Sequence, residues 1–443
     1  MTSLLLRNGR LIDPALGLDQ TGDLLIVDGR IASVSSGPNA TTADREVDCS
    51  GSIVSPGWID MHVHLRVPGQ EHKETIETGT AAAAAGGFTA IAVMPNTEPS
   101  LDSVKTIHWL LDECRDRAVV RVLPIGAITI GRAGQELVDF DALADLGVVG
   151  FSDDGISTAN SALMAEALAA SKRIGIPIMV HCEDPYLVGG VMHEGEVSAR
   201  LGLPGIMAAA EESFIARDCL LAHETGGWLH VLHVSTGIGL QIVKQARALG
   251  AHVTVEVMPH HLVMTDHWVA GDRALQNTSE RGPNAPAAHS DTKVNPPLRT
   301  ADDTRALLAG LANGDFDILA TDHAPHAAHE KRDVPITKAA FGMIGLELAV
   351  PTMLALVRAG HLTMTQVIER FSTQPARLWH LLSGRIEPGG IAELTVIDPN
   401  HRWTVTEDAL KSKSKNTPLL GMEMTGRAVM TISEGKVVHD LCK

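Results

Sequence analysis

Short runs of apolar residues recur along the middle of the chain, and stretches with helical periodicity separate them. Amphipathic stretches such as Ser161–Arg173 and Ile238–Leu249 end at glycines, Gly175 and Gly250, as helices commonly do. Eight alternations of strand and helix predict an α/β fold, a (β/α)8 barrel of the TIM type, instead of a doubly wound sheet. The apolar runs lie at about 57–65, 88–95, 119–128, 148–152, 177–182, 228–235, 252–258 and 318–322.

The two ends of the chain show a different pattern. Residues 4–54 alternate short apolar runs with turn signals such as Asn8-Gly9 and Ser35-Ser36-Gly37-Pro38, and similar runs return at 393–398 and 428–432. This alternation is typical of small antiparallel strands. We therefore expect both ends to form one small β-sandwich domain, from residues 1–55 and 380–443, beside a barrel of residues 56–379.

Composition and charge narrow the class of protein. The 443 residues are 44% hydrophobic and 20% charged, which is ordinary for a soluble globular protein. The formal net charge of -17 argues against a nucleic-acid partner, which would require a basic surface. The five cysteines are odd in number and scattered, so we expect a reducing cytoplasm and no disulfide framework. The apolar run near Met1 is too short for a signal peptide or membrane anchor.

Two histidines, His62 and His64, stand one residue apart in the first predicted barrel strand. Because alternate side chains of a strand share a face, these two imidazoles can bind one metal ion. An isolated pair of this kind is more often two unrelated histidines on a solvent-exposed face of a strand. Here, however, further metal-ligating residue types follow the other strands, where barrel enzymes place their active sites. They are Asp153, Asp154, His181, His233, His260, His261, Asp322 and His326, with Asn96 also at a strand end.

These residues exceed what one tetrahedral zinc ion requires, so we expect two ions that share a bridging carboxylate. Such a pair lowers the pKa of a bridging water enough to form hydroxide near neutral pH, and it polarises a carbonyl group for attack. The strand ends therefore predict the hydrolysis of an amide or ester bond. Imidazole and carboxylate ligands also accept manganese or cobalt, so the residue types leave the native metal open.

Several motifs in order resemble those of the cyclic amidohydrolases, and among them of the dihydroorotases that bridge their metals with an aspartate. The similarity spans nearly the whole chain. It implies a zinc-dependent enzyme (EC 3.5.2.3) that interconverts N-carbamoyl-L-aspartate and (S)-dihydroorotate in de novo pyrimidine (UMP) synthesis. The motifs are Pro56–Arg66, Gly86–Thr89, Met94–Thr97, Ser152–Gly155, Asn295–Arg299 and Thr321–His326.

The resemblance also implies the metal ligands. One Zn2+ would be held by His62, His64 and Asp322, and a second by His181 and His233. The bridge in many relatives is a carbamylated lysine, but residues 148–155 contain no lysine. We therefore expect a carboxylate bridge, and the register of the family favours Asp154. Strand geometry alone is equally consistent with Asp153 as the bridging residue.

The resemblance further implies the substrate contacts and the proton transfer. Arg66, Asn96 and His326 would hold the substrate carboxylate, and a planar guanidinium suits that group. His64, Asn295, Phe341 and Gly342 fall where the family contacts the substrate. Asp322 would take a proton from the bridging hydroxide and return it to the leaving ring nitrogen.

Two features depart from the family pattern. Val67 replaces the aspartate that usually follows the substrate-binding arginine. The stretch Asp266–Val294 shows no periodic spacing of apolar residues, which predicts a long loop that is either a lid over the site or a surface insertion. Among the other histidines, His230 is expected to pack outward against a helix, and His72 and His329 have no partner in any motif.

Three hypotheses about function remain at this stage. The first is a two-zinc dihydroorotase. The second keeps the metals but changes the ring to allantoin or a hydantoin, in which case Arg66 and Asn96 would not matter for turnover. The third is a non-catalytic dihydroorotase-like subunit that scaffolds aspartate transcarbamoylase, although every matching ligand position is filled here. A homo-oligomer or a complex with aspartate transcarbamoylase is expected by analogy alone, and no membrane partner is expected.

Overall fold

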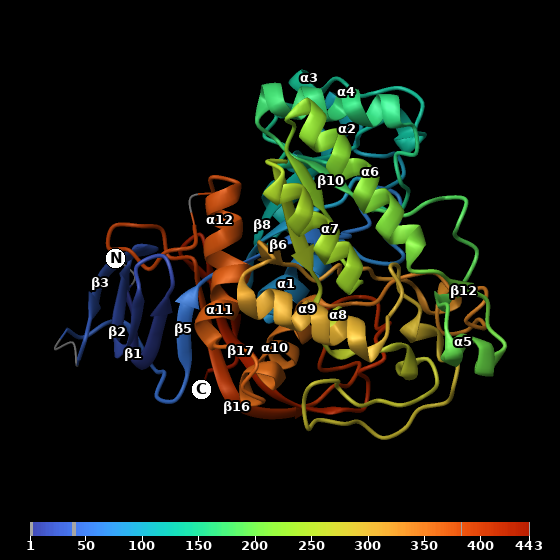
Figure 1. The fold of residues 1–443 in the computed structure, drawn as a ribbon. Coiled ribbons are helices and arrows are strands. Elements are labelled where there is room, and N and C mark those ends of the chain that lie inside the picture. Colours follow the sequence, from blue (N-terminus) through green and yellow to red (C-terminus); the bar gives the residue numbers. More distant parts are fainter. Residues whose placement is uncertain (1–2, 38–40, 382, 443) are drawn as a thin grey trace.

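The computed structural model describes residues 3–37, 41–381 and 383–442. Pro38, the last residue of one predicted turn, lies outside the described residues, as do the extreme ends of both predicted terminal segments. Figure 1 shows two parts, a barrel surrounded by helices and a sheet at its side that contains both chain termini.

Eight parallel strands form the barrel, and each lies within one of the eight predicted apolar runs. They are hydrogen-bonded in the order β15-β14-β13-β10-β9-β8-β7-β6. The first and last strands also meet, because Val63 pairs with His323 and the His64 amide donates to the His323 carbonyl at 2.9 Å. The strands are β6 (Trp58–Val63), β7 (Phe88–Val93), β8 (Arg121–Gly126), β9 (Gly150–Phe151), β10 (Ile178–Val180), β13 (Leu229–Val231), β14 (Val253–Val257) and β15 (Ile318–Leu319). The predicted TIM-type barrel is confirmed.

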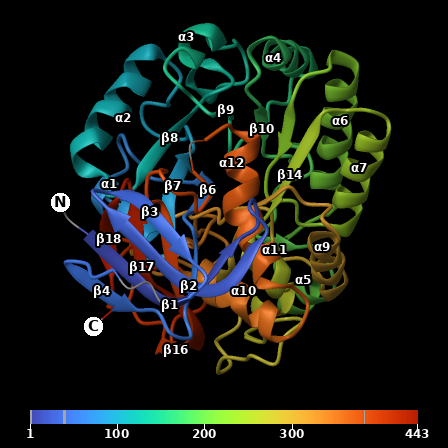
Figure 2. The ribbon, with the colours of Figure 1, turned by 90° about the vertical axis from the view of Figure 1, so that its left-hand side faces the viewer.

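Helices surround the strands as a ring (Figure 2). The ring contains α1 (Ile76–Ala85), α2 (Val104–Arg117), α3 (Phe140–Ala144), α4 (Ser161–Ile174), α6 (Ala209–Thr225), α7 (Gly237–Ala248), α9 (Ala301–Asn313) and α10 (Ala349–Arg358). Shorter elements follow some strands: α5 (Glu196–Leu201), α8 (Pro259–Val263), and the strand pair β11 (Met192–His193) and β12 (Gly205–Ile206). The short helix α11 (Met364–Ile368) follows α10. In the described part of the chain, no helix is both long and apolar enough to cross a membrane.

One end of the barrel is closed by α12 (Gln374–Leu378), which lies at the centre of the ring in Figure 2. Trp379, just after this helix, donates from its indole nitrogen to the carbonyl of Val149, immediately before β9, at 2.8 Å. Trp379 also belongs to a buried cluster with Met61 and Met179 from the barrel strands. Because the N-terminal end is filled in this way, the pocket lies at the C-terminal ends of the strands.

The strands from both chain ends form one mixed sheet, which confirms that the termini build a single β unit. Its order is β18-β17-β16-β5-β1-β2-β3, and β4 pairs with β1. β5 connects the two ends because it is antiparallel to β16 and parallel to β1. The predicted domain boundaries stay a prediction. The strands are β1 (Ser3–Asp13), β2 (Leu18–Val27), β3 (Arg30–Ser35), β4 (Arg45–Asp48), β5 (Ile53–Pro56), β16 (Leu394–Thr404), β17 (Glu423–Ser433) and β18 (Lys436–Asp440).

The long segment 266–294 is irregular, as predicted, but it is packed against the protein. Trp268 and Leu275 are buried in it. The guanidinium of Arg273 donates to the carbonyls of Pro418 and Leu420 at 2.6 and 2.7 Å. All residues of this segment are described, and none of them lines the pocket at the strand ends. Of the two alternatives, the structure therefore favours an insertion that packs on the C-terminal segment over a lid.

Candidate metal centre and substrate pocket

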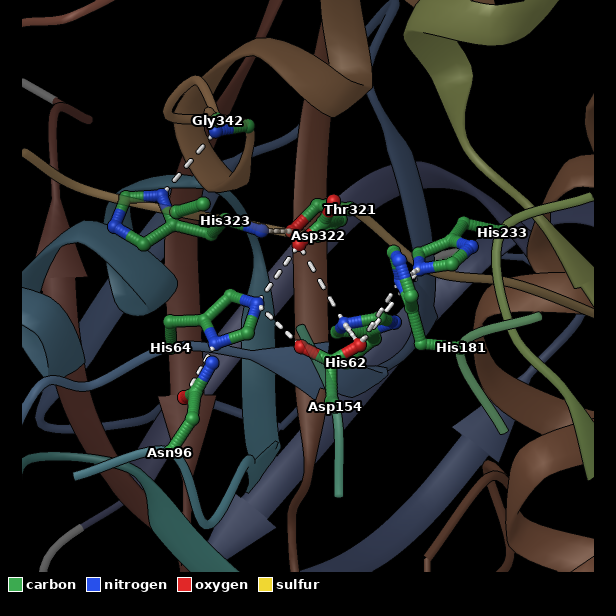
Figure 3. A network of polar contacts seen from close by, with 12 residues as sticks. His62, His64, Asn96, Asp154, His181, His233, Thr321, Asp322, His323 and Gly342 are labelled. Atoms are coloured by element: carbon green, nitrogen blue, oxygen red, sulfur yellow. Dashed lines mark hydrogen bonds and ion pairs between the residues drawn. The ribbon is translucent and has the colours of Figure 1, made fainter. Parts of the chain in front are cut away.

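A pocket of about 170 Å³ lies at the C-terminal ends of the barrel strands. It brings together all of the site residues that the family resemblance implied except His62, which is fully buried beside it. Asp153, His260 and His261, which also follow predicted strands, do not line the pocket. Figure 3 shows the polar residues at its base. The pocket is lined by His64, Arg66, Asn96, Asp154, Gly155, His181, His233, Asn295, Asp322, Ala324, His326, Phe341 and Gly342.

The backbone leaves the strand conformation where these side chains begin. β6 ends at Val63, so His64 lies just beyond the strand that was expected to contain it, and Arg66 follows outside the strand. Arg66, His233 and Asp322 have positive φ angles of 62°, 32° and 49°. Such angles are uncommon for residues other than glycine and tend to occur at functional sites. The turns direct these side chains into the pocket, which simple strand alternation does not predict.

The Asp154 carboxylate lies between four imidazoles (Figure 3). Its Oδ1 atom is 3.7 Å from Nε2 of His62, from Nδ1 of His181 and from Nε2 of His233. Its Oδ2 atom is 3.5 Å from Nε2 of His64. Nδ1 of His181 and Nε2 of His233 are 2.9 Å apart. One carboxylate thus faces two pairs of histidines, which is the arrangement that a bridging ligand requires.

Asp322 provides a second carboxylate on one side of this cluster. Its Oδ1 atom is 2.9 Å from Nε2 of His64 and 3.5 Å from Nε2 of His62. Two buried groups therefore have ligand atoms close enough to hold a metal ion: His62, His64 and Asp322 in one, and His62, Asp154 and His233 in the other. These two groups support a binuclear metal site.

The neighbouring Asp153 faces another direction. Its carboxylate accepts hydrogen bonds from the amides of Ile128 and Thr129 at 3.0 and 3.1 Å, and from the hydroxyls of Thr129 and Thr158 at 2.6 and 3.2 Å. These bonds occupy both of its oxygens. Of the two adjacent aspartates, Asp154 is the one whose carboxylate lies among the histidines.

The cluster has the chemistry of a cation site. Nε2 of His62 and Oδ1 of Asp154 are buried and have no hydrogen-bond partner among the described residues, although buried polar atoms are normally paired. Burial disfavours a charged imidazole, yet the nearby carboxylates of Asp322 and Glu256 outweigh it and raise the pKa of His62 to about 10. The carboxylates thus stabilise a positive charge at this position, which a divalent ion bound by neutral imidazoles would supply.

A buried glutamate that the sequence analysis did not select supports the cluster. Oε1 of Glu256, in β14, is 2.7 Å from Nδ1 of His62 and accepts the His233 amide at 3.2 Å. Burial would raise the pKa of Glu256, but His62 and His230 lower it to about 2, so this carboxylate is ionised. Metal-binding histidines commonly donate their second nitrogen to such a carboxylate. A charged residue in a buried strand of uncharged, mainly apolar residues was the available signal.

The expectation that His230 packs outward is wrong. Its ring is fully buried, with Nδ1 2.8 Å from the Thr254 hydroxyl and Nε2 3.3 Å from Glu256, and it contacts Trp379 edge-on at 5.3 Å. The prediction counted strand alternation back from His233. The positive φ of 32° at His233 breaks that alternation, so both histidines point toward the barrel interior.

Arg66 and His326 lie together in the same pocket. Nη2 of Arg66 is 3.2 Å from Nε2 of His326, and Nε donates to the Pro325 carbonyl at 3.2 Å. Arg66 is 7% exposed, and burial lowers its pKa to about 10, which leaves it charged at neutral pH. Burial and the charge of Arg66 also lower the pKa of His326. A cationic fork beside a neutral imidazole suits a carboxylate ligand.

Asn96 and Asn295 contact the histidines as well as the pocket. Oδ1 of Asn96 is 2.9 Å from Nδ1 of His64, so this amide also orients a metal-ligating candidate. Nδ2 of Asn295 donates to Glu183 at 2.9 Å and lies 3.2 Å from Nε2 of His181. Oδ1 of Asn295 has no partner among the described residues. These amides therefore have hydrogen-bonding atoms left for a ligand.

A second residue that sequence analysis did not find, Asn416, holds the wall of the pocket from outside the barrel strands. It is fully buried. Its Oδ1 atom accepts the His326 amide at 3.0 Å, and Nδ2 donates to the carbonyls of Ala324 and Gly342 at 3.0 and 3.2 Å. The polar run Lys411–Asn416 carries no signal that separates this asparagine from an ordinary loop residue.

Val67, where the family pattern has an aspartate, is 2% exposed and packs in the main hydrophobic core. It does not line the pocket formed by the described residues. In this chain the substitution therefore places a methyl-bearing side chain in the core and removes no group from the pocket surface.

Comparisons with known proteins agree with this geometry. Residues 51–237 match the family model described as "Dihydro-orotase-like". The chain is 44% identical over 438 residues to the dihydroorotase of Pelobacter propionicus, and the aligned region covers 99% of both chains. It is 46% identical over 438 residues to the dihydroorotase of Pelotomaculum thermopropionicum, and that aligned region covers 98% of both chains. Among solved structures, the L-hydantoinase (dihydropyrimidinase) of Arthrobacter aurescens superimposes with a TM-score of 0.86 at 26% identity, over 100% of this chain and 97% of that one.

Proposed function

The chain belongs to the dihydroorotases, metal-dependent cyclic amidohydrolases, and from that premise we propose how it works. We propose that it interconverts N-carbamoyl-L-aspartate and (S)-dihydroorotate with two zinc ions at the His/Asp cluster. The reaction would serve pyrimidine biosynthesis. The observation that carries this proposal is the Asp154 carboxylate between four imidazoles, with a buried arginine in the same pocket.

The buried cation of the pocket supports the choice of substrate. Dihydroorotate carries a carboxylate on its ring, whereas hydantoin and allantoin do not. Arg66 has a charged guanidinium that is buried, and its contacts are to the Pro325 carbonyl and the His326 ring, neither of which carries a negative charge. His326 and Asn96 lie in the same pocket and can complete the carboxylate site. We assign the substrate ring to the side of the pocket that Asn295, Phe341 and Gly342 line.

The proposed metal ligands are the six that the family resemblance implied. When bound, the ions would activate water near neutral pH and polarise the ring carbonyl. Glu256 orients His62, and Asn96 orients His64. One ion would be held by His62, His64 and Asp322, the other by His181 and His233, with Asp154 shared.

Asp322 is the proposed acid and base. It lines the pocket, and Oδ1 faces His62 and His64. Its burial would favour the neutral acid, but the surrounding imidazoles lower its pKa, which keeps the carboxylate ionised. An ionised carboxylate at this position can accept a proton from the attacking water. It can then deliver the proton to the ring nitrogen as the amide bond breaks.

The location and partners belong to the same proposal. All five cysteines are free thiols, which supports a reducing cytoplasm. The small-molecule substrate is the primary partner. The alternative of a non-catalytic subunit of aspartate transcarbamoylase is disfavoured because the ligand atoms of both metal groups are present and close together.

Turnover of three rings by the purified protein tests the proposal. Dihydroorotate, allantoin and hydantoin would be incubated separately with metal-analysed protein, and the loss of ring absorbance followed. We expect dihydroorotate to be hydrolysed much faster than the two rings without a carboxylate. Faster turnover of hydantoin or allantoin would support the second hypothesis, and no turnover with both ions bound would support the scaffolding role.

A further inference from the structure

Outside the pocket, two histidines that had no partner in any sequence motif meet a glutamate. His72 lies in the loop between β6 and α1, and His329 and Glu330 form most of the short 3-10 turn Ala328–Glu330 after β15. Nε2 of His72 is 3.2 Å from Oε1 of Glu330. The two imidazole rings are stacked with centroids 6.0 Å apart. Residues more than 250 positions apart in the sequence therefore form one cluster.

The cluster has the composition and spacing of a metal site. One ligand atom from each residue lies within 4.8 Å of the other two. Tetrahedral zinc with bonds of about 2.0 to 2.1 Å separates its ligand atoms by about 3.3 Å. The His72 side chain is 48% exposed and that of Glu330 is 25% exposed, so small rotations can close the remaining gap. Two histidines and one glutamate with a solvent-facing fourth position form a known zinc ligand set.

We propose that His72, His329 and Glu330 form a third divalent-metal site, which takes Zn2+ or a similar imidazole-binding ion. The site is separate from the barrel cluster. It connects the loop after β6, which carries Arg66, to the loop after β15, which carries His326. Oε2 of Glu330 accepts the Ala327 amide at 3.1 Å and lies 3.8 Å from Nδ1 of His326, so the site borders the pocket wall.

A neighbouring lysine competes for the same carboxylate. Nζ of Lys73 is 3.3 Å from Oε1 of Glu330, the oxygen that also faces His72. A bound dication and this ammonium repel each other at short range, although solvent screens part of the repulsion. The third site is therefore weaker than the barrel cluster, and removal of the Lys73 charge strengthens it. This opposite effect of two neighbouring substitutions separates a metal site from a chance group of surface histidines.

The experiment counts metal ions in the untagged holoprotein. Samples that hold the ions of the barrel cluster are dialysed against free Zn2+ from about 1 to about 100 μM, and zinc per chain is measured by mass spectrometry. We expect one additional equivalent in the unmodified protein. His72→Ala and His329→Ala should each weaken its binding at least tenfold. Lys73→Gln should tighten it about tenfold, and His108→Ala, at an exposed position of α2, should leave it unchanged.

The outcomes are distinct from those that test the proposed function, because metal counting needs no turnover. An additional equivalent that persists in both His72→Ala and His329→Ala would overturn the proposal. So would the absence of any additional equivalent up to about 100 μM zinc, or equal binding by the Lys73→Gln variant. Both histidine substitutions lie at the surface, and the retained ions of the barrel cluster report that these variants are folded.

Discussion

Substitution of Arg66 tests the substrate assignment in a way that separates binding from metal chemistry. Arg66→Ala removes the buried cation of the pocket and its contact to His326, whereas Arg66→Lys keeps the charge but loses the planar fork. Neither substitution touches an atom of the His/Asp cluster. We therefore expect both variants to retain their metal ions.

The expected magnitude follows from the contacts that the guanidinium can make. A hydrogen bond to a charged group contributes about 1.5 to 3 kcal/mol. Loss of the paired bonds to a carboxylate by Arg66→Ala should thus cost about 3 kcal/mol, a decrease in kcat/KM of about 100-fold. Arg66→Lys keeps one charged donor, so we expect a decrease of about tenfold. Most of the loss should appear in KM, because the carboxylate lies away from the reacting bond.

Steady-state kinetics on dihydroorotate measure this prediction, with zinc content and melting temperature recorded for each variant. Arg115→Ala, at a 71% exposed position, provides a matched arginine control. The reasoning would be refuted if Arg66→Ala kept its zinc and its melting temperature and turned over dihydroorotate with an unchanged kcat/KM.

Three further predictions concern the ligands, the pocket wall and a buried acid. Asp154→Asn should lose bound zinc. Asp153→Asn should keep its zinc but melt at a lower temperature, because the hydrogen bonds from the backbone amides to this side chain weaken. Equal zinc content in the two variants would contradict the assignment of the bridge. Asn416→Ala should raise KM for dihydroorotate about tenfold with zinc retained, because the His326 amide loses its acceptor. An unchanged KM would show that the pocket wall does not need this hydrogen bond. Burial raises the pKa of Glu347 to about 7, so its contribution to stability is complete below its ordinary pKa and is lost as the pH rises through 7. Relative to the unmodified chain, Glu347→Gln should therefore gain up to about 3 kcal/mol of stability between pH 5 and 8. Thermal unfolding of both proteins across this range measures the difference in stability, and a difference that does not change with pH would contradict the prediction.

The barrel could be predicted from sequence because each strand is part of a short, mainly apolar run between helical stretches. Every predicted run contains one of the eight strands, and α4 begins at Ser161 as expected. Periodicity reports which residues are buried, and in a barrel both faces of a strand are buried. Periodicity does not predict the path of the chain after a strand ends, and β6 ends at Val63, before His64, which was predicted to lie in that strand.

The candidate ligands could be named because their types are unusual at the ends of apolar strands. Residues that act through the ligands were harder to find. Glu256 interrupts the apolar strand β14 and could have been selected on that ground. Asn416 comes from a polar segment, and its role depends on a contact between residues 90 positions apart. His72 and His329 likewise gain a shared environment only when the chain is folded.

The central claim is that the His/Asp cluster holds two metal ions that turnover requires. Its most direct test is removal of metal with a chelator, followed by stepwise addition of zinc while bound metal and dihydroorotate turnover are measured together. The account predicts no turnover without metal and activity that rises until two ions per chain occupy the barrel cluster. Full activity in the metal-free protein, or activity complete with a single ion, would contradict it.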